Sequence, residues 1–455
     1  MNNNIIEGNP TKKFFIDMIT RDISIEDAII DLLDNSIDGA NRINSENYNN
    51  LRINLTITDK EFIIQDNCGG FSLETAQKYA FRFGRPEDAP ASNSTVGRFG
   101  IGMKRSLFKI GRHFTVESQH LQDHFKVEVN VDEWSKKTKI IKTEIGVERT
   151  IDDWGFLYSS VQEPMKNDGT LIKISNLNRE VLDLFTDNNF LNDLSDDIQK
   201  LLNFSLQKGI MITLNGKPLS GKRIDLLFLE NNKPYYVEGR VNNVNYRIVA
   251  GLGGIGEPQN SGWYIYCNNR LVLEADTTSI TGWGVQPVPK WHINYVMFRG
   301  ILFLDAEETL DLPLTTTKKG VDATSEVYKA LLPLMRNAML KVFDFLKKIP
   351  EMGNEANDYR LRLCENFDKI SVVELKSYDF VNHPQKQFDA PELDMDIISR
   401  KKQHVRIAYD ANKELADLAK DHAEVRSYKD LGYITFEYYL KMEAIKNEES
   451  HSIEL

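Results

Sequence analysis

The chain has 455 residues, too many for one compact core, so two or three domains are expected. Hydrophobic residues make up 41% and charged residues 27%, an ordinary globular composition. The formal net charge of −11 excludes a surface that coats nucleic acid non-specifically. An anionic ligand would have to be bound locally, by backbone amides, a helix N-terminus, a few cations or a metal ion.

We expect a cytoplasmic protein without a membrane partner. Met1 to Asn4 are followed by neither a basic region nor an apolar stretch, and no segment approaches the ~18 apolar residues of a membrane span. The three cysteines, Cys68, Cys267 and Cys364, lie far apart and form no CxxC pair. This spacing supports neither a zinc module nor a disulfide framework.

The residues from Ile25 to Ala40 have the periodicity of an amphipathic helix, and Ser24 is placed to cap its N-terminus. Another face of this helix carries Asp31 and Asn35, which are one turn apart. The amide oxygen of Asn35 could ligate Mg²⁺ while the Asp31 carboxylate orients or deprotonates a water. A solvated acidic helix face is the alternative interpretation.

Two alternating segments, Leu51 to Thr58 and Glu61 to Gln65, predict a β-hairpin. The hairpin leads directly into Asp66-Asn67-Cys68-Gly69-Gly70. A carboxylate at a strand end can accept from the exocyclic amine of a base, and a following glycine lets the ring approach the backbone. A tight turn after a hairpin would explain the same residues.

A helix is predicted from Leu73 to Phe83, and a mobile lid from Gly84 to Thr95, where small polar residues and prolines gather. The lid ends in Gly97-Arg98-Phe99-Gly100-Ile101-Gly102-Met103-Lys104, before a helix expected from Ser106 to Ile110. Glycines before a helix N-terminus present free N–H groups to phosphate, and Arg98 and Lys104 add positive charge. The spacing is not that of a P-loop, because the lysine follows the last glycine by two residues.

A fourth signal is Gly169-Thr170, which opens an apolar alternation and could place a hydroxyl beside the base pocket. The four signals, taken in this order, resemble the GHKL superfamily, which includes the gyrase B subunit, the large heat-shock chaperone, histidine kinases, MutL and MORC ATPases. The segment LLDNSIDGA is similar to the first motif of MutL and gyrase, and GRFGIGMK to the glycine box of the heat-shock chaperone and MORC proteins.

The resemblance implies an α+β fold: a Bergerat (GHKL) α/β sandwich, then a ribosomal-S5-like α/β transducer domain and a mostly helical C-terminal segment. It implies ATP and Mg²⁺ as ligands, with Asn35 on the metal and Asp66 on the adenine amine. Thr170 would support Asp66, and Lys104 would face phosphate. The glycines that would shape the pocket and the phosphate cradle are Gly70, Gly97, Gly100 and Gly102.

The sequence departs from the family pattern at two positions. The second motif has Cys68 where glycine is usual, which we interpret as an adjustment of the turn. The usual general base is a glutamate four residues before the asparagine, and this chain has Asp31. Aspartate is shorter by roughly 1.5 Å, and a misplacement near 1 Å can cost on the order of 10²-fold in rate. We therefore expect a slow ATPase.

Beyond about Lys217 the pattern becomes β-rich, with strands expected over Tyr235 to Val241, Tyr246 to Gly251 and Gly262 to Val272. The last of these resembles the strand–turn–strand around the NGR motif of GHKL transducer domains. A loop containing Lys318 and Lys319 then precedes a helix expected from Ser325 to Lys348. By resemblance Lys318 would reach the γ-phosphate, with Lys319 as the second choice and two exposed loop lysines as the alternative.

A literal GxGxxG occurs at Gly251 to Gly256, but Glu257-Pro258-Gln259-Asn260 follows, which is typical of a loop. A dinucleotide site needs a helix at that point, so we reject a Rossmann interpretation. Glu351 to Asp358 reads as a linker, and the pattern after Met395 is mostly helical.

These observations predict an ATP-binding domain over residues 1–216, a transducer domain over 217–350 and a helical extension over 351–455. The plan is nearest to a MutL or MORC ATPase core. We expect a slow ATPase whose N-terminal segment, Met1 to Thr20, and lid close on ATP, pairing two protomers as a clamp on a partner protein or DNA. The alternatives are a non-hydrolysing ATP sensor or scaffold, and a chaperone-like client remodeller.

Overall fold

The computed structural model describes residues 10–84, 101–142, 148–224, 226–229, 232–254, 258–315, 319–365, 370–380, 383–393 and 407–443. The chain divides into two compact units, Met1–Leu393 and Asp394–Leu455. Within the described ranges, every helix is too short or too polar to cross a membrane.

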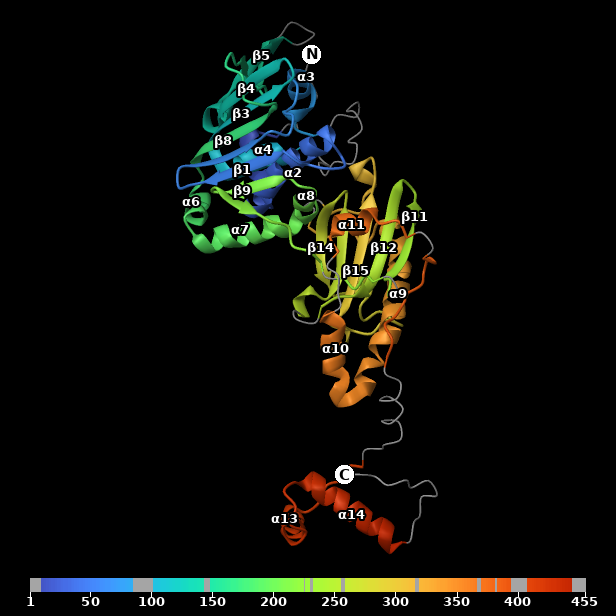
Figure 1. The fold of residues 1–455 in the computed structure, drawn as a ribbon. Coiled ribbons are helices and arrows are strands. Elements are labelled where there is room, and N and C mark those ends of the chain that lie inside the picture. Colours follow the sequence, from blue (N-terminus) through green and yellow to red (C-terminus); the bar gives the residue numbers. More distant parts are fainter. Residues whose placement is uncertain are drawn as a thin grey trace, which may run out of the picture. The chain divides into compact units, whose positions relative to one another are not determined.

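The N-terminal part of the first unit is built on a mixed sheet that has eight strands among the described residues, in the order β10-β9-β1-β2-β8-β3-β4-β7 (Figure 1). β1 and β9 pair in parallel, and the other neighbours pair antiparallel. The strands are β1 (Arg52–Ile57), β2 (Glu61–Asp66), β3 (Gly111–His120), β4 (Asp123–Asn130), β7 (Tyr158–Ser160), β8 (Gly169–Leu177), β9 (Met211–Leu214) and β10 (Lys217–Leu219).

The predicted hairpin is confirmed as β1 and β2, whose register pairs Leu55 with Ile64. Residues alternate between exposed and buried along β1 because successive side chains point to opposite faces of a strand. The buried face, which includes Ile53, Leu55 and Phe62, packs with the apolar residues of helix α2 in one core. One face of this sheet therefore carries the helices, and the other carries polar residues such as Asn54.

The predicted first long helix is confirmed as α2 (Ile25–Ile43), with the Ser24 hydroxyl accepting from the Asp27 amide at 3.1 Å. α2 contacts α4 (Gly102–Ile110), and both contact the sheet. Other helices of this part are α1 (Lys12–Arg21), α3 (Leu73–Thr75), a π-helix (Ala76–Ala80), α5 (Val131–Lys136), α6 (Arg179–Phe185), α7 (Asn188–Leu201) and α8 (Asn203–Gln207).

Two helix boundaries differ from the sequence prediction. α4 begins at Gly102 rather than Ser106, so the end of the glycine-rich segment is its first turn. The helix predicted to reach Phe83 changes to a π-helix at Ala76 and ends at Ala80. Helix ends are set by packing as well as by local pattern, and here α4 packs against α2, with Gly102 of its first turn close to Asp31.

A second sheet follows, with five strands in the described ranges and the order β11-β12-β15-β13-β14. The strands are β11 (Tyr235–Val241), β12 (Val244–Leu252), β13 (Gly262–Cys267), β14 (Arg270–Asp276) and β15 (Phe298–Asp305). Helix α9 (Glu326–Leu346), capped by Ser325, packs on β11, β12 and β15. Residues after the GxGxxG segment form a short 3-10 turn at Pro258–Asn260 rather than an α-helix, as the rejection of a Rossmann interpretation requires.

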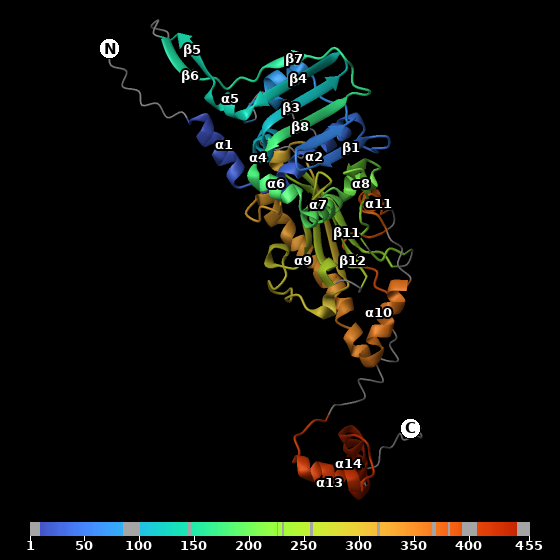
Figure 2. The ribbon, with the colours of Figure 1, turned by 90° about the vertical axis from the view of Figure 1, so that its left-hand side faces the viewer.

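The other face of this sheet is covered by α11 (Val372–Ser377) and the residues after it, including Phe380. The linker predicted from Glu351 to Asp358 is wrong, because a 3-10 helix (Ile349–Glu355) runs there into α10 (Ala356–Glu365). Met352 and Tyr359 are buried in that segment. Figure 2 shows α9 beside the second sheet and α10 below it, and a separate ribbon of β5 (Thr138–Lys142) and β6 (Glu148–Asp152) beyond the first sheet.

The second unit contains α13 (Lys413–His422) and α14 (Tyr428–Met442), which lie in the segment whose pattern predicts helices. Neither helix buries a residue. Several apolar side chains of the second unit are exposed, among them Leu415, Tyr433 and Phe436.

Candidate functional site

Helix α2 carries a stripe of four aspartates, Asp27, Asp31, Asp34 and Asp38. Their spacing of four, three and four residues places them on one face, one above the other. The last three are buried, with exposed fractions of 4%, 1% and 7%. Buried carboxylates need charged or hydrogen-bonding partners, so this face must be matched by cations.

Three cations from three different elements meet this stripe. Arg105 of α4 donates to Oδ2 of Asp31 from Nε at 2.9 Å and from a terminal nitrogen at 2.5 Å. Arg270, at the start of β14, pairs with Asp34. Lys319 pairs with Asp27 at 2.5 Å. α2 is thus held from one side by its neighbour α4 and from another by the second sheet and the loop before α9.

Arg270 is among the most buried charges of the described chain, with 4% of its side chain exposed. Burial lowers the pKa of Arg270 to about 10, and the carboxylates of Asp31 and Asp27 oppose that shift. The guanidinium therefore stays charged at neutral pH, and the pair with Asp34 joins two buried, opposite charges. Removing either partner would leave the other buried and unpaired, at a cost of roughly 3–5 kcal/mol.

Asn35, the residue expected to ligate a metal, lies one turn after Asp31 on α2 and has an exposed side chain. Its carboxamide oxygen is therefore accessible to a hard cation such as Mg²⁺. Within the described ranges, no three histidine, cysteine, aspartate or glutamate side chains gather into a metal cluster. A magnesium ion on Asn35 would have to take most of its ligands from water and phosphate oxygens, as Mg²⁺ at nucleotide sites does.

Asp66, at the end of β2, is held by donors from three segments. Ser36 of α2 donates its hydroxyl to Oδ2 at 2.7 Å, and Oδ1 accepts the amides of Cys68 at 2.8 Å and Thr170 at 3.2 Å. Burial raises the pKa of Asp66, and these three hydrogen bonds oppose the shift. Asp66 is 8% exposed, and Oδ2, which accepts only from Ser36 among these donors, has a second lone pair for an incoming donor.

Two positions near Asp66 require glycine. At both, a Cβ would come too close to neighbouring backbone, and one of them also has a positive φ. Gly70 has φ +56°, and a Cβ there would clash with the carbonyl oxygen of Gln119 and lie 2.8 Å from that of Gly169. A Cβ on Gly39 of α2 would lie 2.6 Å from the carbonyl oxygen of Cys68. α2, the β2–α3 loop and β8 therefore meet backbone to backbone around Asp66, which no larger residue would allow.

The two cations near the start of α4, Lys104 and Arg105, point in different directions. Lys104 is 2% exposed and donates to the carbonyl oxygen of Ala80 at 2.8 Å. Burial lowers the pKa of Lys104 to about 7. Arg105, the next residue, lies on the Asp31 side, where a Cβ on Gly102 would also come within 3.4 Å of Oδ2 of Asp31.

Several residues singled out in the sequence lie outside the described ranges. They are Gly97, Arg98 and Gly100 of the glycine-rich segment, most of the expected lid, and Lys318. The described residues of the candidate site are brought together from α2, the end of β2, the start of β8 and the start of α4.

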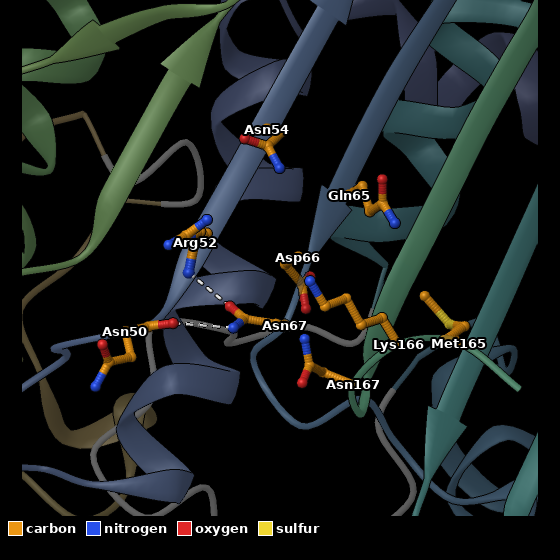
Figure 3. Close-up of a pocket in the computed structure, with 9 residues that line it drawn as sticks. All are labelled: Asn50, Arg52, Asn54, Gln65, Asp66, Asn67, Met165, Lys166 and Asn167. Atoms are coloured by element: carbon orange, nitrogen blue, oxygen red, sulfur yellow. Dashed lines mark hydrogen bonds between the residues drawn. The ribbon is translucent and has the colours of Figure 1, made fainter.

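A separate pocket opens on the polar face of the first sheet, around the end of β2 (Figure 3). There Asn67 accepts from the Arg52 amide at 2.6 Å and donates to the carbonyl oxygen of Asn50 at 3.0 Å. The other lining residues are Asn54, Gln65, Asp66, Met165, Lys166 and Asn167. The Asp66 carboxylate is bonded to Ser36 on the helical side, so this pocket lies on the opposite face from α2.

Sequence reasoning missed three residues of the site: Ser36, Arg105 and Arg270. Ser36 could have been found, because it lies in the first motif and a small polar residue facing a strand-end carboxylate is a natural hydrogen-bond donor. The spacing of the four aspartates could have shown that cations must oppose them, but not which ones. Arg105 and Arg270 are distant in sequence from their partners, and only the packing of α4 and β14 against α2 selects them.

The candidate site thus has two carboxylates in different surroundings. Asp66 is held by neutral donors, and Asp31 is held by a cation. The Asp66 region can recognise a planar donor such as the exocyclic amine of a base. The Asp31 region, with the accessible Asn35 amide and the N-terminus of α4 nearby, suits an anion and its counter-ion.

One comparison with known proteins bears on this region. A search of curated proteins found no match to the chain. Residues 23–153 match the family model described as histidine kinase-, DNA gyrase B-, and HSP90-like ATPase. The matched segment contains α2, β2 and α4, and Thr170 lies beyond it. The match places the segment from residue 23 to residue 153 with the GHKL superfamily and supports ATP binding there.

Proposed function

We propose that the protein binds Mg·ATP beside α2, with the adenine amine on Asp66, and hydrolyses it slowly. The observation that carries this proposal is the Asp66 carboxylate, which is buried and oriented by Ser36 and the amides of Cys68 and Thr170. Gly70 keeps a side chain out of the space next to it. The family match at residues 23–153 points to the same ligand.

The triphosphate would lie towards the start of α4, where Gly102 is the first helical residue. Gly97, Arg98, Gly100 and Lys104 are further candidates for its cradle. Bound Mg²⁺ would neutralise phosphate charge, and Asn35 offers it an accessible amide oxygen. Asp31, which Arg105 holds in the nucleotide-free structure, would orient or deprotonate the attacking water.

The second sheet and α9 would act as the transducer, in an S5-like domain over residues 217–350 of a MutL- or MORC-like core. The support is the pair of contacts by which this region reaches α2, Arg270 with Asp34 and Lys319 with Asp27. A change at the nucleotide can move α2, and these ion pairs would pass that movement on. Lys318 or Lys319 would be the lysine that reports the γ-phosphate.

ATP binding would pair two protomers through the N-terminal segment and the lid, closing a clamp on a partner protein or DNA. α1 offers an apolar surface for such pairing, because Phe14 and Met18 are 59% and 50% exposed. Its other face is anchored, since Lys12 donates to the carbonyl oxygens of Trp134 and Lys137.

Titration calorimetry with ATP, with and without Mg²⁺, tests the proposal on the full chain. We expect binding that Mg²⁺ strengthens in the wild type and a lost Mg²⁺ effect in Asn35→Ala. A non-hydrolysable analogue should shift the wild type towards a dimer in sizing chromatography, and Asn35→Ala should remove that shift. A wild type that gives no heat with Mg·ATP would refute the proposal.

A non-hydrolysing ATP sensor is the second candidate, favoured by one observation. Asp31 is a short carboxylate whose Oδ2 is already occupied by two donors of Arg105. Measured phosphate release separates the two functions. If the wild type releases phosphate no faster than Asp31→Asn while binding ATP equally well, the protein is a sensor.

A further inference from the structure

The contact between Arg105 and Asp31 joins the start of α4 to the middle of α2. Both guanidinium donors, Nε and a terminal nitrogen, converge on the same oxygen, Oδ2, at 2.9 and 2.5 Å. The side chain of Asp31 is 5% exposed and that of Arg105 is 15% exposed. The carboxylate is thus shielded from solvent, and the guanidinium is the more accessible partner.

The Arg105 side chain points in a different direction from that of its neighbour Lys104 and is less enclosed. The ammonium of Lys104 is enclosed and donates to a backbone carbonyl on the other side of α4. Arg105 instead faces the side on which Gly102 approaches Asp31. Of these two adjacent cations, Arg105 is the one directed towards the region proposed for the triphosphate.

A guanidinium exchanges readily between a carboxylate and a phosphate. Both anions accept its planar fork of N–H donors, and charge-assisted bonds to either are about twice as strong as neutral ones. A triphosphate carries several negative charges, against one on Asp31. Since both charges of the pair lie in a poorly solvated region, an anion arriving beside them competes strongly for the guanidinium.

We propose that Arg105 is a positioning residue with two partners: it holds Asp31 in the nucleotide-free protein and moves to the phosphates when ATP binds. This inference rests on the proposed ATP site. The exchange removes both Arg105 donors from Oδ2 of Asp31 when a triphosphate is present, so this constraint on the carboxylate is lifted only when there is a substrate to attack. Arg105 therefore links nucleotide occupancy to the state of the candidate base.

The test compares ATP with adenosine, because adenosine has the base and sugar but no phosphate. Titration calorimetry on the full chain with Mg·ATP should show Arg105→Met binding at least about 10-fold more weakly than the wild type. Adenosine affinity should stay within about 2-fold. Asp31→Asn should bind Mg·ATP a few-fold more tightly, because Arg105 no longer has to leave a carboxylate, and should bind adenosine as the wild type does.

Arg105→Lys keeps the charge without the planar fork and should recover part of the ATP affinity. The matched control is Arg112→Met, which removes another arginine–aspartate pair, the more solvent-exposed one between Arg112 and Asp132. It should leave both affinities unchanged. If Arg105→Met does not fold, the ATP and adenosine affinities of Arg105→Lys and Asp31→Asn provide the same test.

Two results would overturn the inference while leaving the proposed ATP site intact. One is an unchanged ATP affinity in the Arg105 variants, and the other is an equal loss for ATP and adenosine, which indicates a purely structural role. A wild type that binds neither ligand instead refutes the ATP site itself.

Discussion

The two ends of the candidate site are built from different interactions. At Asp66 the partners are neutral, a hydroxyl and two backbone amides, and they come from segments that glycines bring into backbone contact. At Asp31 one partner is a cation on a long side chain, Arg105. Backbone donors cannot leave, whereas a guanidinium can change partners. The base end is therefore a fixed template, and the phosphate end can respond to its ligand.

Gly70→Ala tests whether the base end is rigid, and it should have the largest effect. The substitution forces a Cβ at φ +56° into the carbonyl oxygen of Gln119, which costs on the order of 3 kcal/mol or more. Gly216→Ala is the matched control, because Gly216 has φ +79° with nothing within 4 Å of the added Cβ. It should cost about 1 kcal/mol. Thermal unfolding measures the loss of stability in both variants. Equal losses would show that the backbone around Asp66 can move to accommodate the added Cβ, and that the base end is not rigid.

Asp66→Asn should come next, acting on binding rather than on folding. The amide keeps the shape but loses the charged acceptor, so ATP and adenosine should both bind about 30-fold more weakly or worse, from a loss on the order of 2 kcal/mol. Asp59→Asn, in the exposed turn of the same hairpin, is the control. Calorimetry that shows Asp66→Asn equal to Asp59→Asn would remove Asp66 from the base site.

Lys104→Met should have the smallest effect and the most specific pH dependence. Burial lowers the pKa of Lys104 to about 7. At and below that pH the buried ammonium is charged, which destabilises the folded state relative to the unfolded state, where the ammonium is solvated. That penalty is relieved as the pH rises from about 7 towards the ordinary lysine value. Lys104→Met should therefore be stabilised relative to the wild type by about 1 kcal/mol near pH 6.

Unfolding temperatures of Lys104→Met and the wild type, measured between pH 6 and pH 10, check this expectation. The difference should shrink steadily across that range. Lys60→Met, at an exposed turn, should show no such trend. A difference that stays constant with pH would mean that Lys104 is charged throughout, and it would favour Lys104 as a cation of the phosphate cradle.

The regular elements of both sheets could be predicted because their signals are local. Alternation gave the hairpin of β1 and β2 and the strands β11 and β12, and helical periodicity with a serine cap gave α2 and α9. Errors arose where packing overrides local pattern. α4 starts one turn early because it packs on α2, and the expected linker after α9 is helical because Met352 and Tyr359 are buried there.

The sequence by itself determined which residues could form a nucleotide site, since the order of Asp31, Asn35, Asp66 and Gly70 follows the chain and matches a known pattern. Tertiary structure alone decided what each of them touches. Ser36 meets Asp66, Arg105 meets Asp31, and Arg270 meets Asp34 across distances of up to 236 positions in the sequence. Composition and periodicity carry no information about such pairs, because a charge finds its partner through the packing of whole helices and strands.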